Sequence, residues 1–278
     1  MRIDNLLPTR LLTKDDDNKV TILLIGDVML GRTVMTHSLD KVGDPRYPFF
    51  KVAETLRKAD LVFINLENPV IQNCPRHSEG FKFCADPKMI EGLTYAGVDV
   101  VNLANNHSRN YGQDGLNQTV DYLNKAGMQV TGLNALAIRQ FNNVKFGFLG
   151  FDFVTNQAKN SDYELVKSSD SKVDVLIVGV HWGSEYQPKA NPSQKSWARK
   201  LVENGADVVI GHHPHWVQEL EYPIYYSLGN FVFDQMWSEE TRKGLAVRLT
   251  FEGKKLIKED LLPCYMSSWA QPEFIERN

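Results

Sequence analysis

The sequence predicts an α/β protein, because short β-branched runs alternate with amphipathic segments from residue 20 onward. With 278 residues, of which 42% are hydrophobic, the chain is long enough to bury a substantial core. No repeat, low-complexity tract or linker divides it. We therefore expect one main domain over residues 20–262, preceded by an N-terminal extension at 1–19 and followed by a loosely packed tail at 263–278.

Nine segments have the length and apolar character of buried strands, and their alternation with helices predicts a largely parallel sheet. They are residues 20–26, 61–65, 98–103, 129–131, 145–151, 173–180, 206–210, 224–227 and 245–251. Four amphipathic segments predict helices at 50–59, 87–96, 115–126 and 192–204. Three of these helices stop near a glycine, which favours the left-handed position that ends a helix. Residues 156–171 are polar and predict a surface excursion.

Charge and hydropathy exclude several classes of protein. The formal net charge is −3, so no excess of basic side chains is present to bind a phosphate backbone, and nucleic acid is not an expected partner. The longest apolar runs, at 20–25 and 173–180, are far shorter than the roughly 20 residues that cross a bilayer. The N-terminus has no signal-peptide pattern. A cytoplasmic protein is expected, although a chain that had lost a leader would read the same way.

The three cysteines, Cys74, Cys84 and Cys264, match no zinc or redox motif in their spacing. A bond between Cys74 and Cys84 is the alternative, but free thiols are expected in a cytoplasmic chain.

Polar side chains follow most predicted strands, at the edge where open α/β sheets bind ligands. Asp27 ends the first strand, Glu67 follows the second, and Asn106 with His107 follows the third. Each feature alone is also explained by a turn or a helix cap. Their repeated position behind a strand favours a shared site.

Five of the seven histidines lie at three strand ends, whereas a lone histidine there would more often be a core or rim residue. They are His107, His181, His212, His213 and His215. Together with the acids and amides upstream they form a nitrogen and oxygen ligand set without thiolates, which suits Zn²⁺, Mn²⁺ or Fe²⁺. Glu67 could bridge two ions, and a pair roughly 3.5–4 Å apart can generate a hydroxide for in-line attack. The sequence therefore predicts a divalent metal site.

These motifs resemble the CapA family, named for a poly-γ-glutamate capsule biosynthesis protein, within the calcineurin-like metallophosphoesterases. The resemblance runs from about residue 20 to residue 233. It rests on six ordered motifs: Gly26-Asp27 with Arg32, residues 65–67, residues 105–107, residues 181–183 with Glu185, residues 213–215 and residues 226–231. It implies a four-layer α/β/β/α sandwich of the metallophosphoesterase type, with two facing mixed sheets flanked by helices and the metals at one edge.

The resemblance also implies roles for single residues. Asp27 and His215 would bind one ion, and Asn106, His181 and His213 the other, with Glu67 as the bridging carboxylate. His107 is similar to the histidine that protonates a leaving group or steadies a transferring phosphoryl oxygen. Arg32 is expected to bind an anionic group of the substrate, with an ion pair to Glu185 as the alternative. The residues expected around the substrate are Glu185, Ser227, Asn230 and His212. Of these, His212 lies outside the His-x-His spacing and is expected either behind the ligands or at the rim of the site.

The implied function is hydrolysis by metal-activated water of a phosphoester or of a γ-glutamyl or other amide bond, in an anionic small molecule or a polyglutamate-like chain. The alternative is a non-catalytic accessory protein that binds a polyanion such as poly-γ-glutamate during synthesis or export. His107 favours catalysis, because binding alone requires no proton donor. A nuclease is disfavoured by the acidic charge balance.

The sequence departs from the wider superfamily at the first strand end, where the usual Asp-x-His reads Asp27-Val28-Met29. The bridging acid is also a glutamate in an unusual motif. We expect one ion to bind tightly. We expect the second, held by Asp27, Glu67 and His215 alone, to bind more weakly, to be absent, or to be completed by the substrate. Metal analysis after mild dialysis checks this prediction. Two equivalents retained with equal affinity would contradict it.

Overall fold

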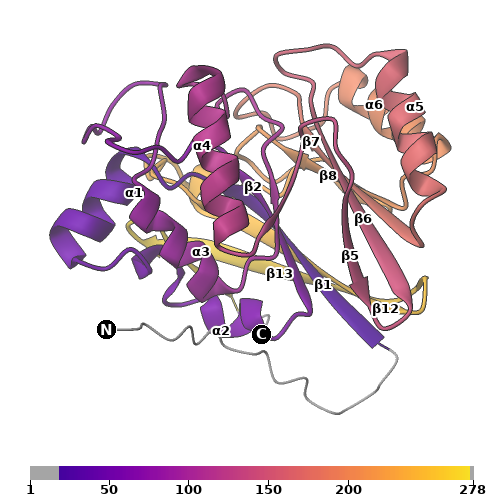
Figure 1. The fold of residues 1–278 in the computed structure, drawn as a ribbon, viewed down its shortest axis with the longest axis horizontal. Coiled ribbons are helices and arrows are strands. Elements are labelled where there is room, and N and C mark those ends of the chain that lie inside the picture. The colour runs from indigo at the N-terminus through magenta and orange to yellow at the C-terminus, as the bar shows by residue number, and fades with distance from the viewer. Residues whose placement is uncertain (1–18, 276–278) are drawn as a thin grey trace.

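The computed structural model describes residues 19–275, and their first sheet is mixed and eight-stranded (Figure 1). Its strands are β1 (Lys19–Val28), β2 (Leu61–Leu66), β3 (Val100–Asn102), β4 (Gln129–Thr131), β11 (Asn230–Val232), β12 (Lys243–Glu252), β13 (Lys255–Ser268) and β14 (Gln271–Phe274). In space they run β14-β13-β12-β1-β2-β3-β4, and β11 pairs with β1. The strands from β1 to β4 are parallel, whereas β12 to β14 are antiparallel to their neighbours.

The second sheet has six strands in the order β5-β6-β7-β8-β10-β9. They are β5 (Ala137–Phe141), β6 (Val144–Asp152), β7 (Val175–His181), β8 (Val208–His212), β9 (Leu220–Glu221) and β10 (Ile224–Tyr225). Its centre is parallel and its two edge strands are antiparallel. Both sheets are therefore mixed, which corrects the largely parallel sheet expected from the alternation of elements.

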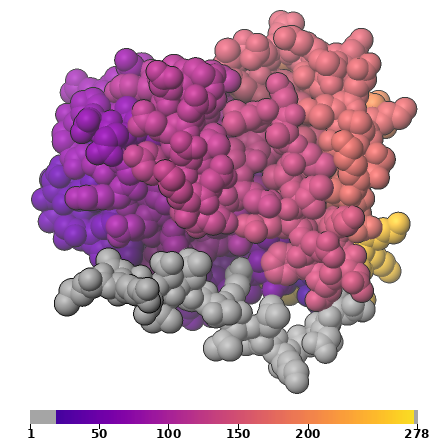
Figure 2. Space-filling model, viewed as in Figure 1, coloured from indigo at the N-terminus to yellow at the C-terminus, as the bar shows by residue number. Residues whose placement is uncertain are grey.

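The helices lie on the two outer faces. They are α1 (Arg32–Thr36), α2 (Ala53–Arg57), α3 (Ile90–Ala96), α4 (Gly112–Lys125), α5 (Asn160–Asp170), α6 (Pro192–Glu203) and α7 (Glu239–Arg242), with a π-helix at His37–Val42 and 3₁₀ turns at Tyr47–Phe49 and Pro87–Met89. In Figure 2 the first part of the chain, in indigo and magenta, fills the left side of the molecule, and the part with α5 and α6 fills the right side. None of the helices between residues 19 and 275 has the length and apolar character needed to cross a bilayer.

Alternate residues of the central strands point into different layers, because side chains of a strand face opposite sides of a sheet in turn. In β1, Leu23 packs into the core shared with α1 to α4, whereas Leu24 packs into the core between the two sheets. In β7, Ile177 enters that central core, and Val178 enters the core beneath α5 and α6. Both faces of these strands are buried, which explains their continuous apolar runs. The four-layer α/β/β/α sandwich is confirmed.

Two segments are more ordered than the sequence predicts. Residues 156–171 contain α5, in which Tyr163 and Val166 lie three positions apart and are buried against the second sheet. The tail after residue 262 is not loosely packed, because β13 pairs with β12 along its length and β14 returns beside it. Of the expected N-terminal extension, residues 1–18 lie outside the described residues, and Lys19 begins β1.

Cys74 and Cys84 form a disulfide, so the expectation of three free thiols is wrong. The chain segments before and after this loop pair through the backbone: Ile71 donates to the carbonyl of Ala85 at 3.0 Å. This pairing closes the loop and brings the two cysteine Cα atoms to 5.9 Å. Cys264 is free and buried, as expected.

Gly26 allows β1 to approach the turn before β11. A Cβ at this position would lie 2.1 Å from the carbonyl oxygen of Gly229, which accepts a hydrogen bond from the backbone of the adjacent Asp27. We expect Gly26→Ala to lower the free energy of unfolding by about 1–3 kcal/mol, because backbone must move. Urea denaturation followed by circular dichroism measures the loss.

Gly147→Ala is the matched control, since its Cβ would meet only side-chain atoms of Val173 and Leu136, at 3.0 Å or more. These side chains can rotate away. The steric explanation is wrong if Gly26→Ala costs no more than Gly147→Ala.

Candidate metal centre

The polar residues at the strand ends meet at one edge of the sandwich, where the carboxyl ends of β1 and β2 face those of β7 and β8. In the first sheet Asp27 pairs in register with Asn65 on one side and Asn230 on the other. In the second sheet His181 pairs in register with His212. Because parallel strands end at the same edge, residues far apart in the sequence gather here.

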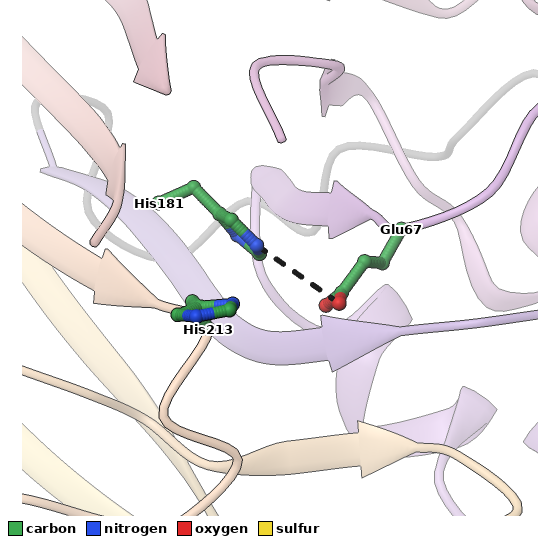
Figure 3. Close-up of side chains that lie close together, drawn as sticks. All are labelled: Glu67, His181 and His213. Carbon is green, nitrogen blue, oxygen red and sulfur yellow. Dashed lines mark ion pairs between the residues drawn. The ribbon is translucent and has the colours of Figure 1, made fainter. Parts of the chain in front are cut away.

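Two groups of buried side chains could each hold a metal ion, and Glu67 belongs to both. The Asp27 group is Asp27, Glu67 and His215, and the His181 group is Glu67, His181 and His213; within each group the potential ligand atoms lie within 4.8 Å of one another. The Nε2 atoms of His181 and His215 lie 3.9 and 3.8 Å from the same oxygen, Oε1 of Glu67. Figure 3 shows the side chains of the His181 group pointing toward one another.

Asn106 adds an oxygen to the His181 group, because its Oδ1 lies 3.0 Å from Nε2 of His181. The His181 group thus has four candidate ligands and the Asp27 group three. Met29, at the position of the histidine that this chain lacks, is buried and its sulfur accepts a hydrogen bond from the backbone of Gly31. The expectation that one ion binds more tightly than the other rests on this difference in the number of ligands.

Asp27 is completely buried and accepts hydrogen bonds from several directions. Its Oδ1 lies 2.9 Å from Nδ2 of Asn65 and 3.0 Å from Nδ1 of His212, and its Oδ2 accepts from the backbone of His213 at 3.1 Å. Burial alone would raise the pKa of Asp27, but hydrogen bonds and charge from His212 and His215 outweigh it and hold that pKa well below its usual range. Asp27 is therefore a carboxylate.

Glu67 is equally buried, but neither of its carboxyl oxygens has a hydrogen-bond partner among the described residues. Burial and the negative charge of Asp27 raise the pKa of Glu67 well above its usual range. A buried carboxyl group without partners is costly, and a cation between it and the imidazoles would satisfy it. The side chains present therefore fit a divalent ion.

The imidazoles of His181 and His213 are in the form that binds metals. Burial, and then repulsion from neighbouring histidines, lowers the pKa of His213 to about 4 and the pKa of His181 well below its usual range. Neutral imidazole offers a lone pair, whereas imidazolium does not.

Asn230 fixes which nitrogen of His215 is free. Its Nδ2 donates to the backbone carbonyl of Thr241 at 2.9 Å, and a carbonyl can only accept. The opposite end of the amide, 2.9 Å from Nδ1 of His215, is therefore its oxygen, and Nδ1 must carry the proton. In the neutral imidazole of His215 the lone pair therefore lies on Nε2, on the side of Glu67. Asn230, expected to contact the substrate, instead lies behind a candidate ligand.

The turn that carries two of the imidazoles has an uncommon backbone. His213 and His215 have φ angles of 93° and 58°, in the left-handed region that favours glycine. The two residues that flank Pro214 are therefore both held in a backbone conformation that histidine rarely adopts.

His107 and Arg32 lie beside this centre and contact the same phenylalanine. His107 stacks on Phe83 with ring centroids 4.0 Å apart, and the Arg32 guanidinium lies 4.5 Å from the centroid of that ring. Burial lowers the pKa of His107, although its hydrogen bond with Asn110 opposes the shift. Arg32 forms an ion pair with Asp234, not with Glu185. Asp234 was missed by the sequence reasoning, yet it too follows an apolar strand.

The other residues expected around the substrate have different surroundings. Glu185 is half-buried and near enough to raise the pKa of Glu67. Ser227 is fully buried, and its Oγ accepts a hydrogen bond from the backbone of Gly229, so it serves a turn. His212 is not on the rim, because it is 1% exposed and bonded to Asp27. Ser227 thus has a structural role, and His212 orients Asp27 from behind, which is one of its two expected positions.

We expect Asn230→Leu to weaken metal binding by about 10–100-fold, because His215 loses the acceptor that fixes its proton on Nδ1. Calorimetric titration with Mn²⁺ or Zn²⁺ measures the change. Asn230→Asp, which keeps an oxygen at that place, should retain more of the affinity. Equal affinities for the leucine variant and the unaltered protein, with both folded by circular dichroism, would rule out this role of Asn230.

Comparison with known proteins relates the chain to capsule synthesis. Residues 21–235 match the family model "Bacterial capsule synthesis protein PGA_cap". The chain is 32% identical over 256 residues to the capsule biosynthesis protein CapA of Bacillus anthracis, covering 80% of this chain and 62% of that protein. It is 27% identical over 284 residues to a "Probable polyglutamine synthesis accessory protein" of Mycobacterium tuberculosis, covering 77% of this chain and 74% of that one. The chain therefore spans less than two thirds of the Bacillus relative's length.

Among solved structures, a "Putative 5'-Nucleotidase" from Staphylococcus aureus is similar in fold, with a TM-score of 0.52 and 15% identity, covering 88% of this chain and 54% of that one. This likeness concerns the fold alone. The family match covers most of the chain and includes every residue of both candidate ligand groups. The chain belongs to the bacterial capsule synthesis protein family PGA_cap, the CapA family whose motifs its strand ends carry.

Proposed function

We propose that the chain is a metal-dependent hydrolase that acts on a phosphoester or on a γ-glutamyl or other amide bond. The observation that carries the proposal is Glu67, a buried carboxyl group without hydrogen-bond partners that two sets of ligands share. If Glu67 had a purely structural role, protein atoms would be expected to donate hydrogen bonds to its carboxyl group, as they do to Asp27. A divalent ion bound here would polarise the substrate and make water more nucleophilic.

The side chains beside the centre suit the remaining steps. Asn110 Oδ1 accepts from the backbone of Phe83 at 2.7 Å and lies 3.0 Å from Nδ1 of His107. Nδ1 of His107 therefore carries a proton, and its Nε2 is left for the substrate or the leaving group. Arg32 is paired with Asp234, but its guanidinium still lies near enough to Glu67 to oppose the rise in the pKa of that carboxyl group. We propose that Arg32 orients an anionic group of the substrate.

A polar cleft beside the centre offers room for the rest of a substrate. It has a volume of about 490 Å³ and is bordered by Asn106, by the strand ends at Asp152 and Gly132, and by Lys159 before α5. Asn106 thus lies between the His181 group and the cleft. A hydrogen-bonding substrate larger than a phosphate group, such as an anionic oligomer, would fit this arrangement.

The second candidate is an accessory protein that binds a polyanion without cleaving it. The mycobacterial relative's name, which speaks of an accessory role in polymer synthesis, favours it. The same cleft and ligand groups would then serve binding alone. Under both proposals the ion in the His181 group is the tight one and that in the Asp27 group the weaker.

The Cys74–Cys84 disulfide opposes the cytoplasmic location expected from the N-terminal sequence. Disulfides persist in oxidising compartments and are rare in the cytoplasm. We propose that the chain works outside the cytoplasm, where a capsule polymer would be met.

The protein loaded with Mn²⁺ or Zn²⁺ is expected to hydrolyse at least one of three substrate types: aryl phosphate monoesters, aryl phosphate diesters and γ-glutamyl peptides. His107→Ala should lower kcat by about 10²–10⁴-fold, the usual contribution of an acid or base catalyst. Chelator treatment should abolish turnover, and added metal should restore it.

His37→Ala is the matched control, because His37 lies on the π-helix against Tyr47 and outside both ligand groups. Catalysis as proposed fails if no substrate turns over with any metal, or if His107→Ala leaves turnover unchanged. Binding of poly-γ-glutamate without turnover would support the accessory role.

A further inference from the structure

We infer that the loop closed by the Cys74–Cys84 disulfide is a positioning element for His107 and Arg32, which it holds through Phe83. The inference rests on the proposed function, because those two residues are its proposed catalytic groups. It adds a residue that no motif contains and makes the disulfide necessary for the geometry of the site.

Phe83 contacts both groups with one ring. Its stack on His107 is close to parallel, with an interplanar angle of 26°, and the Arg32 guanidinium lies within cation–π distance of the same ring. Phe83 is 3% exposed and packs edge-to-face on Phe233, so the ring has little freedom to move. A shift of Phe83 would therefore change the surroundings of both proposed catalytic side chains.

The backbone of the loop contributes two further contacts. The N–H of Phe83 donates to Oδ1 of Asn110, the oxygen that also faces Nδ1 of His107. The carbonyl of Gly80 accepts from Nη1 of Arg32 at 2.9 Å. The loop thus orients His107 through a shared acceptor and Arg32 through a carbonyl, in addition to the aromatic ring.

The disulfide restrains a loop that is otherwise weakly packed. Most side chains between residues 75 and 82 are exposed, whereas Phe83 and Cys84 are buried. Cys84 packs tightly on Gly31, where a Cβ would lie 2.4 Å from the Cys84 carbonyl oxygen, and Gly31 directly precedes Arg32. Opening the disulfide allows this exposed stretch to take many conformations. The contacts of Phe83 must then offset a larger loss of conformational entropy to keep the ring in place.

Reduction by a dithiol such as dithiothreitol gives two thiols, with two electrons and two protons supplied as the reductant closes to its own disulfide. We expect the reduced protein and Cys74→Ser to lose tenfold or more in kcat, because small displacements of catalytic groups are costly. KM should change less. Metal content should stay the same, since every residue of both ligand groups lies outside the loop.

The readout that does not depend on turnover is the NMR spectrum of the His107 ring, assigned by His107→Gln in protein with uniformly labelled histidine. Stacking on Phe83 shields the ring protons, so reduction or Cys74→Ser should move them downfield. Cys264→Ala under the same conditions is the control, because Cys264 is the free cysteine. For Phe83→Leu, which should lower kcat, the control is Phe251→Leu in the core between the sheets.

The outcomes separate the two proposals. If the His107 resonances and kcat are unchanged by reduction that mass spectrometry verifies, the positioning role is overturned. If no substrate is turned over but the resonances move, the loop positions His107 and the proposed catalysis fails. If Phe83→Leu and Phe251→Leu lower kcat equally, Phe83 serves packing alone.

Discussion

The hydrogen bonds to the Asp27 carboxylate join the two sheets at the edge where the candidate centre lies. The carboxylate belongs to β1, yet it accepts from Asn65 in β2 and from His212 and His213 at the end of β8. A buried carboxylate is tolerated only when such donors are present, so its position dictates theirs. Together with the contact between Asn106 and His181, this group fixes how the two sheets meet at this edge.

Amide side chains extend this network through the first sheet. Oδ1 of Asn65 accepts from Asn102 and Asn105, so the chain of bonds runs from β3 to Asp27. With Asn230 behind His215, most polar groups around the centre have a protein partner, and besides Glu67 the ring atoms Nε2 of His212 and Nδ1 of His213 have none among the described residues. Glu67 is the acidic group among these, and the demand for positive charge is therefore concentrated at its carboxyl group.

The strand-end rule predicted much of the centre from sequence, because β1, β2, β3, β7 and β8 are apolar runs that end in polar side chains. It could not place Asp234 against Arg32 or Asn230 behind His215, since both contacts depend on how β11 lies beside β1. The pairing of the last strands was missed because β13 carries many charged residues. The disulfide was not predicted, because free thiols are the rule in the cytoplasm, where the N-terminal sequence placed the chain. Assignment of roles within the two ligand groups came from family resemblance, not from spacing.

The left-handed backbone at His213 and His215 links folding to the supply of metal. Each such residue costs about 1–3 kcal/mol, which glycine would largely avoid but without an imidazole. The strained turn lowers the stability of the sandwich, and an ion bound as proposed would return stability in proportion to the logarithm of the free metal concentration. Metal scarcity would then reduce the amount of folded protein as well as its activity, so that the abundance of the protein reports on the metal in its surroundings.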